Sequence, residues 1–375
     1  MSRRVLVSAR DPGAAAQLRP LVAALAAERN VTLTVVASGA ALGILDGAGP
    51  RPLAFTLPDG TNHVPAGRDT GPLLDQARKL VVRIQPDVIV TGISSLGVGI
   101  DEALLAVASG RPTFAVQDYP GDANAIDGAY AGEYLVRDDD AARLTRTRFD
   151  VKATAVGSLR HAGYTALDVT ALRERKRADL GAGARPVIGF FGQPPEIPGH
   201  EAIFGHLVEA LPGRRPAPVV VLREHPKAQG TRETHTAALL RAGVSVVAGD
   251  DGPVESWLVA CDVVTTPFSH CAIDFAFLSA ASPDPLGTVL FLLTAPETWA
   301  FMREHSGLQV PDGVDAGLGA IARSPTEISG MLDTLLGAEA RGAYHAAARR
   351  LPSGANLHAI VARLLEAAAA TRAVK

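Results

Sequence analysis

The chain has 375 residues, more than a single hydrophobic core usually organises, and this length predicts two domains. Hydrophobic residues make up 47% of the chain and charged residues 20%, which excludes an intrinsically disordered protein. With 36 basic and 39 acidic residues the formal net charge is -3, which argues against a dedicated nucleic-acid-binding protein.

Short apolar runs alternate with amphipathic stretches along nearly the whole chain, the pattern of a parallel sheet built from βαβ units. In the first half we predict strands at residues 5–8, 31–37, 87–92, 113–117, 134–136 and 153–157, and helices at 14–29, 40–46, 73–84 and 101–108. In the second half we predict strands at 187–191, 219–222, 244–248, 262–266 and 289–293. Helices are expected at 172–180, 231–242, 253–260, 271–279, 325–336, 338–350 and 357–370.

These elements divide into two α/β halves of similar size, and we place the boundary just after Gly157. Residues 1–157 then form the first domain and residues 158–375 the second, with 158–170 as the linker and the C-terminal helices free to pack back on the first domain. The expected fold class is α/β, with two Rossmann-like doubly wound domains that face a cleft.

The two cysteines, Cys261 and Cys271, form neither a disulfide framework nor a zinc motif, so we expect small buried side chains. The first apolar run is too short for a secretory signal, and no window is long enough to span a bilayer. Together these features predict a cytoplasmic protein without a transmembrane segment, and they leave a homodimer open.

In the second half, polar residues gather where predicted strands end, which is the edge at which open α/β sheets bind ligands. Gly192 and Gln193 follow one strand, and the segment Arg-Glu-His-Pro at 223–226 follows the next. Arg223 and His225 are two residues apart and share a face in extended backbone, so both can contact a phosphate. His225 is also a candidate general acid. A simple turn at Gly192 and a salt-bridged loop at Arg223 are the alternatives.

A third strand end carries Ser269 and His270 at the start of the helix predicted from 271. The free N–H groups and the dipole of a helix start suit a diphosphate, although Ser269 is equally suited to cap that helix. Asp274 lies one turn into the helix, where it either contacts the ligand or only complements the helix dipole.

In the first half, Asp11 and Gly13 lie in the loop after the first strand, and Asp11 is a candidate base or a helix N-cap. Asp118 follows another strand, with Asp122 and Asp127 close behind in the sequence; one of the three would deprotonate an acceptor hydroxyl. Gly92 and Ser94 at a third strand end are expected to line the same acceptor site. None of these carboxylates has the spacing of a metal-bound diphosphate site, so no metal is predicted. Five further histidines are expected on the surface or in packing positions: His161, His200, His206, His235 and His305.

Two doubly wound domains with these motifs resemble the GT-B superfamily. The segment 223–226 resembles the Arg-Pro-His-Pro of CDP-glycerol glycerophosphotransferases, and 266–274 is similar to their Thr-Asp-Tyr-Ser-Ser-x-x-x-Asp. Val156-Gly157-Ser158 with Asp168 resembles a Val-Thr-Gly-Asn segment of UDP-N-acetylglucosamine 2-epimerases. The resemblance implies that the acid at Asp274 faces the sugar or ribose of a donor and that the nucleobase lies near residues 250–253.

The chain also departs from these families. Pro267 and His270 replace an acid and a serine of the glycerophosphotransferase segment, whose His-Gly segment is also missing. The epimerase signature Asp-Ser-Gly-Gly-x-x-Glu-Glu is absent, and its Glu pair is reduced to Asp274.

The resemblance implies a metal-independent glycosyltransferase that holds a nucleotide-diphosphate-activated donor in its second domain and an unidentified acceptor in its first. The donor is a substrate, and no cofactor is predicted. The alternatives are a nucleotide-sugar 2-epimerase, a polyol-phosphate transferase and a noncatalytic nucleotide-sugar-binding protein.

Overall fold

The computed structural model describes residues 2–228, 230–249, 252–352 and 354–373. The chain forms two compact units. The first contains the described residues up to Gly163 and those from Pro352 onward, and the second runs from Tyr164 to Leu351. Within the described residues, no helix is both long enough and apolar enough to cross a membrane.

The first unit is built on a parallel sheet whose described strands follow the order β3-β2-β1-β5-β7-β8-β9. Its strands are β1 (Arg3–Ala9), β2 (Val31–Ala37), β3 (Leu53–Ala54), β5 (Val88–Thr91), β7 (Thr113–Val116), β8 (Glu133–Val136) and β9 (Ala153–Ala155). A separate antiparallel pair joins β4 (His63–Val64) and β6 (Val98–Gly99). The helices are α1 (Pro12–Ala26), α2 (Ala41–Leu45), α3 (Gly71–Ile84), α4 (Ile100–Ala106), α5 (Asp139–Phe149) and α14 (Leu357–Ala373).

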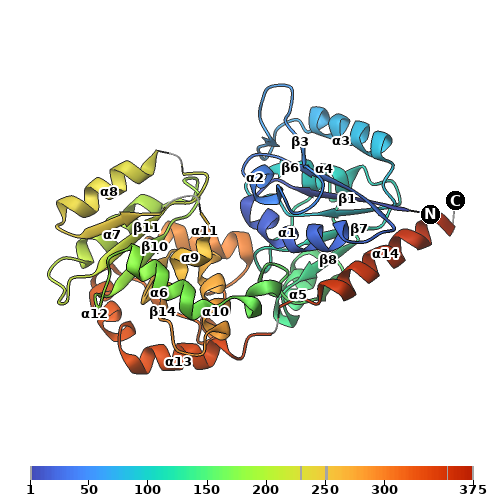
Figure 1. The fold of residues 1–375 in the computed structure, drawn as a ribbon. Helices are drawn as coiled ribbons and strands as arrows, with labels where there is room; N and C mark the ends of the chain where they lie inside the picture. Colours follow the sequence, from blue (N-terminus) through green and yellow to red (C-terminus); the bar gives the residue numbers. More distant parts are fainter. Residues whose placement is uncertain (1, 229, 250–251, 353, 374–375) are drawn as a thin grey trace. The chain divides into compact units, whose positions relative to one another are not determined.

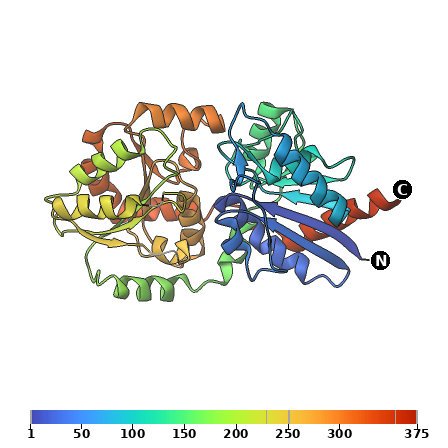
Figure 2. The same ribbon diagram turned by 90° about the horizontal axis from the view of Figure 1, so that it is seen from above.

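Alternating side chains of β1 bury against opposite layers of this unit. Val5 and Val7 belong to the core that contains α1 and α14, whereas Leu6 belongs to the core under α3 and α4. Helices on both faces explain why the strands are apolar on both sides rather than alternating. The last helix, α14, packs against α1, and both views show the red C-terminal helix beside the blue N-terminal elements (Figures 1 and 2).

The second unit has its own parallel sheet, whose described strands follow the order β12-β11-β10-β13-β14-β15. The strands are β10 (Val187–Phe191), β11 (Val219–Arg223), β12 (Ser245–Ala248), β13 (Val263–Thr266), β14 (Thr288–Leu292) and β15 (Ala320–Ala322). The helices are α6 (Val169–Asp179), α7 (His200–Ala210), α8 (Thr231–Arg241), α9 (Val254–Leu258), α10 (Cys271–Ala281), α11 (Pro296–Ser306), α12 (Pro325–Leu335) and α13 (Ala338–Ala348).

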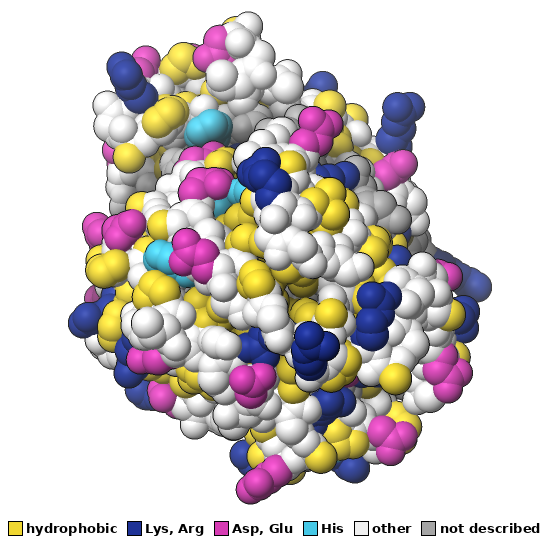
Figure 3. Space-filling model, turned by 90° about the vertical axis from the view of Figure 1, so that its left-hand side faces the viewer, with side chains coloured by type: hydrophobic (Ala, Val, Ile, Leu, Met, Phe, Trp, Pro, Cys, Tyr) yellow, Lys and Arg dark blue, Asp and Glu magenta, His cyan; other side chains and the backbone are white. Residues whose placement is uncertain are grey.

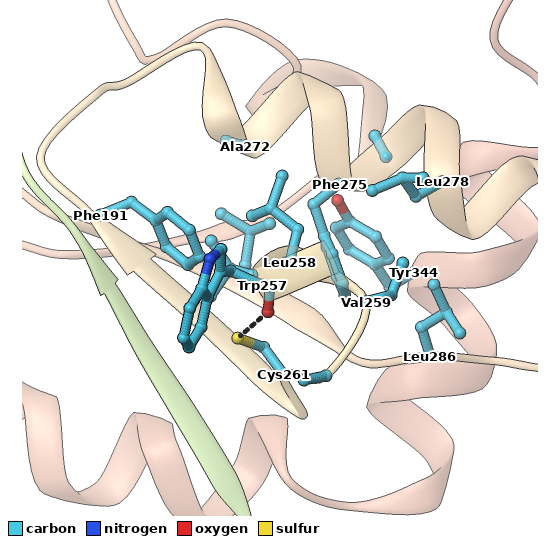
Figure 4. Close-up of a cluster of buried hydrophobic side chains, with 14 of the residues drawn as sticks. Phe191, Trp257, Leu258, Val259, Cys261, Ala272, Phe275, Leu278, Leu286 and Tyr344 are labelled. Atoms are coloured by element: carbon cyan, nitrogen blue, oxygen red, sulfur yellow. Dashed lines mark hydrogen bonds between the residues drawn. The ribbon is translucent and has the colours of Figure 1, made fainter. Parts of the chain in front are cut away.

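The same alternation separates two cores in the second unit. Val221 of β11 packs into the core beneath α6, α9, α10 and α13, and Leu222 packs into the core beneath α7, α8 and α12. Figure 4 shows part of the first of these cores, where the Cys261 thiol donates to the Trp257 carbonyl at 3.3 Å. Burial raises the pKa of Cys261, so this thiol is the buried apolar group expected from the sequence. Cys271 is only partly buried.

Several elements differ from the sequence-based predictions. Helices α7 and α11 and strand β15 were not predicted, because α7 follows a run rich in Pro and Gly, two of the three buried residues of α11 are polar and β15 has only three residues. The expected linker contains a 3-10 helix at Arg160–Ala166, and the two units divide after Gly163 rather than after Gly157. The C-terminal helix α14 packs back on the first unit, as the sequence allowed.

Candidate functional site

The loop that follows β11 directs Arg223 and His225 to one side of the sheet. Arg223 and Val221 are two residues apart in β11, so their side chains lie on the same face of the sheet, the face covered by α9 and α10. One of its nitrogens donates to the Gly252 carbonyl at 2.7 Å. The Nδ1 atom of His225 accepts from the Lys227 amide at 3.1 Å, so in the neutral ring the proton is on Nε2. His225 therefore presents an Nε2–H donor.

Glu224 lies between these two residues and faces the opposite side. A Cβ atom at Gly192 would lie 2.8 Å from Glu224 Oε2 and 3.3 Å from the His225 amide, so only glycine fits there. Gly192 was expected to let a ligand approach the backbone; in the structure it is the Glu224 carboxylate that approaches it. The Gly192 amide also donates to the Arg223 carbonyl at 2.9 Å, which joins the ends of β10 and β11.

Gln193 connects the end of β10 with the start of α10. Its side-chain oxygen accepts from the Ser269 amide at 2.8 Å and from the Phe268 amide at 3.2 Å. The Ser269 hydroxyl in turn accepts from the Cys271 amide at 3.3 Å, but the N-cap residue of α10 is His270 rather than Ser269. The amides of this helix start were expected to be available to a diphosphate, but these three already have acceptors within the protein.

His270 is the N-cap residue of α10, and Asp274 lies in the first turn of that helix. Asp274 is fully buried. The structure thus places its side chain within the second unit, and the role at the sugar or ribose that the resemblance implies stays a prediction. Asp250 and Asp251, expected near a nucleobase, lie outside the described residues.

In the first unit, Asp11 is the N-cap residue of α1 by position, yet its carboxylate makes no capping hydrogen bond. It accepts instead from the Ser95 amide at 2.8 Å and pairs with the Arg10 guanidinium at 3.1 Å. Arg10 also donates to the Ser95 carbonyl. This exchange ties the end of β1 to the loop after β5, and it holds Asp11 in place at the same strand edge.

Asp118 and Asp122 join Asp11 to form a group that we name the first-unit carboxylates. The Asp118 carboxylate lies over the start of α1, where a Cβ atom at Gly13 would overlap it. Burial and the nearby charges of Asp118 and Asp11 together raise the pKa of Asp122 to about 7, against the opposing effects of Arg148 and a hydrogen bond from Ser95. The group thus holds one carboxyl that exchanges its proton near neutral pH. Asp127 is exposed.

Two buried carboxyls beneath this edge were not singled out from the sequence. Asp101 accepts from the Ser8 hydroxyl at 2.5 Å, the Arg10 amide at 3.0 Å and the Ser94 hydroxyl at 3.2 Å. Burial raises the pKa of both Asp101 and Glu102. Their signal in the sequence was a pair of acids at a predicted helix start, which usually indicates only a favourable charge for the dipole.

Ser94 is therefore a buried hydrogen-bond partner of Asp101. Gly92 lies close to Ala14 of α1, since a Cβ atom added at Gly92 would lie 2.5 Å from the Ala14 Cβ. Both were expected to line an acceptor site, and in the structure both have packing roles. Among the described residues, no group of three or more His, Cys, Asp or Glu side chains is arranged to hold a metal ion.

No family model and no curated protein matches the chain. Solved structures do match over nearly its whole length. The UDP-GlcNAc 2-epimerase from Neisseria meningitidis, bound to UDP-GlcNAc, is 13% identical with a TM-score of 0.70, and the match covers 97% of this chain and 100% of that one. The UDP-GlcNAc 2-epimerase from Methanocaldococcus jannaschii, in complex with UDP-GlcNAc and UDP, is 14% identical with a TM-score of 0.67 and coverages of 97% and 99%.

A glycosyltransferase from Rickettsia africae is 9% identical with a TM-score of 0.60, and the match covers 99% of this chain and 98% of that one. At these identities the likeness shows the fold alone. Two successive Rossmann-like units, each with a parallel sheet covered by helices on both faces, match these structures along the chain. The chain therefore has the GT-B fold.

Proposed function

We propose that the protein is an enzyme that acts on a UDP-sugar, and that its reaction is epimerisation at C2 of the sugar. The solved structures of UDP-GlcNAc 2-epimerases that resemble it support this substrate class. The reaction removes a proton from carbon and returns one to the opposite face of the ring, so it needs groups that exchange protons near neutral pH.

The observation that carries the proposal is the set of first-unit carboxylates. Asp122, with a pKa of about 7, can accept a proton and give one back at neutral pH. Asp118 and Asp11 lie close enough to raise that pKa by their charges, so each is a second candidate for the proton on the other face. Two negative charges beside an ionised carboxylate destabilise it, so this grouping does not serve the stability of the fold.

In the second unit, Arg223 and His225 are the candidates for the diphosphate. One Arg223 nitrogen donates to the Gly252 carbonyl, and the planar fork of a guanidinium suits phosphate oxygens. The Lys227 amide donates to Nδ1 of His225, which puts the proton of the neutral ring on Nε2, and an imidazole N–H can donate to a phosphate oxygen. Both donors would stabilise negative charge that develops on the diphosphate when the bond to the sugar weakens.

Glycosyl transfer is the second candidate function, and one feature of the second unit favours it. Asp274 is fully buried and the next residue is Phe275, where the resemblance to the epimerases leads one to expect a Glu pair. A transferase needs a single base for its acceptor, and the first-unit carboxylates can supply one. A noncatalytic nucleotide-sugar-binding protein is the outcome if neither reaction occurs.

The test is incubation with UDP-GlcNAc in D2O, followed by NMR of the sugar. Epimerisation predicts a second C2 epimer and deuterium at C2, and Asp122→Asn is expected to reduce both at least about 100-fold because it removes the proton carrier. UDP release that depends on an added acceptor, without deuterium at C2, would identify a transferase. A rise in melting temperature with the nucleotide sugar but no turnover would identify a binding protein.

A further inference from the structure

The residue between Arg223 and His225 points away from both. Glu224 is two residues beyond Leu222, so its side chain lies on the same face of the sheet, the face covered by α7 and α8. Only 3% of that side chain is exposed. Its carboxylate packs over Gly192 and bonds to His235 of α8, so Glu224 anchors the Arg223–Pro226 loop from behind.

Both ring nitrogens of His235 face carboxylates. Nδ1 lies 2.5 Å from Glu224 Oε1, and Nε2 lies 2.8 Å from Glu201 Oε2 on α7. An ionised carboxylate can only accept, so with both glutamates ionised each nitrogen carries a proton and the ring is an imidazolium. Glu201, His235 and Glu224 therefore form a charged group that we name the triad.

The surroundings of the triad favour the charged ring. Burial by itself would lower the pKa of His235, but the hydrogen bonds to Glu224 and Glu201 and their charges raise it above its ordinary value. Phe204 stacks on the ring with centroids 4.0 Å apart, and His200 lies 6.2 Å away. Burial lowers the pKa of His200, so that neighbour is neutral. Among the described residues, the titratable groups that face His235 are Glu201, His200 and Glu224.

We propose that the triad is a positioning device for the phosphate-binding loop, so that protonated His235 holds Arg223 and His225 in place and donor affinity depends on that proton. The proposal rests on the proposed function, because it takes the Arg223–Pro226 loop as the diphosphate site. His235 acts only through Glu224 and is a positioning residue. Asp122, which carries the proposed chemistry, belongs to the other unit and is not involved.

The direction of the pH effect follows from the geometry. When His235 loses its proton, the neutral ring can keep its Nδ1–H on buried Glu224, because Glu201 on the other side is largely exposed and can turn to water. The bond to Glu224 then loses its charge assistance, so the contact that anchors the loop is weaker. Affinity is therefore greatest below the pKa of His235 and falls, by up to about tenfold per pH unit, as the pH rises through it.

The experiment is calorimetric titration of the full-length protein with UDP-GlcNAc between about pH 6 and 9, combined with NMR titration of the histidine rings. The variants are His235→Gln, which cannot be charged, and Glu201→Gln, which removes one partner and is expected to fold because 68% of the Glu201 side chain is exposed. Figure 3 views the molecule from the side of α7 and α8 and shows histidine side chains next to acidic ones on that surface. His305→Gln on α11 is the matched control, since His305 is exposed and lies outside the triad.

We expect His235→Gln to bind the nucleotide at least about fivefold more weakly at pH 6.5 and to lose the dependence on pH. Glu201→Gln should keep the dependence but move its midpoint to lower pH, together with the NMR midpoint of the His235 ring. The His305→Gln profile should match that of the wild type. A wild-type profile retained in His235→Gln, or a midpoint unmoved in Glu201→Gln, overturns the role of the triad. Absence of binding in the wild type at every pH instead overturns the proposed function.

Discussion

Replacing Asp122 by asparagine tests whether this carboxyl holds its proton at neutral pH. Raising its pKa from 3.8 to about 7 means that ionising Asp122 in the folded protein costs up to about 4 kcal/mol more than in the unfolded chain. The folded protein holds the proton more tightly, so this stability is present at low pH and lost as the pH rises through about 7. Of the total, about 2 to 3 kcal/mol falls between pH 5 and pH 8, because the unfolded carboxyl is already ionised at pH 5.

Asparagine cannot ionise, so Asp122→Asn avoids that loss. We expect its free energy of unfolding, relative to the wild type, to rise by about 2 kcal/mol between pH 5 and pH 8, whatever constant cost the lost hydrogen bonds add. Denaturant unfolding of both proteins at the two pH values measures this difference.

The control is Asp127→Asn, which makes the same chemical change at an exposed residue of the same loop region. Asp127 has φ 52°, a conformation that asparagine also adopts, so the backbone should be unaffected. A difference between Asp122→Asn and the wild type that is the same at both pH values would show that Asp122 is ionised throughout, and would remove it as the proton carrier.

Two further changes test the packing behind these sites. Gly13→Ala should turn the Asp118 carboxylate away from the start of α1 and lower turnover at least about tenfold in a steady-state assay, with little change in the unfolding midpoint; unchanged turnover would remove Asp118 from the mechanism. Asp262→Asn should destabilise the protein by about 3 kcal/mol in denaturant unfolding, because Arg173 and Arg177 pair with this buried carboxylate at 2.8 and 2.9 Å; a loss below about 1 kcal/mol would show that water replaces it.

The strand pattern was predictable from the sequence because it depends on local chemistry. Runs such as 187–191 and 219–222 are apolar at every position, and only a strand covered on both faces needs that composition. The loops at their ends were recognisable for the same reason, since polar residues, Gly and Pro appear where burial stops. The short strand β15 lacks such a signal, and so do helices α7 and α11, whose residues show no clear apolar stripe.

Which side chains meet was a different matter. The spacing of two residues predicted that Arg223 and His225 share one face, but it could not show that Glu224 contacts His235, eleven residues further along the chain. The same limit applies to Asp101, whose hydrogen bond from Ser8 joins residues 93 positions apart in the sequence.

The sequence by itself determined two α/β units, their parallel strands and the polar residues at the strand ends, because periodicity and turn residues record local preference. Only the tertiary structure decided the ionisation of those residues. The pKa of Asp122 is raised by burial and by Asp118 and Asp11, and His235 is charged because two glutamates from other elements face it. Charge and burial depend on distances in space, and spacing along the chain does not fix those distances.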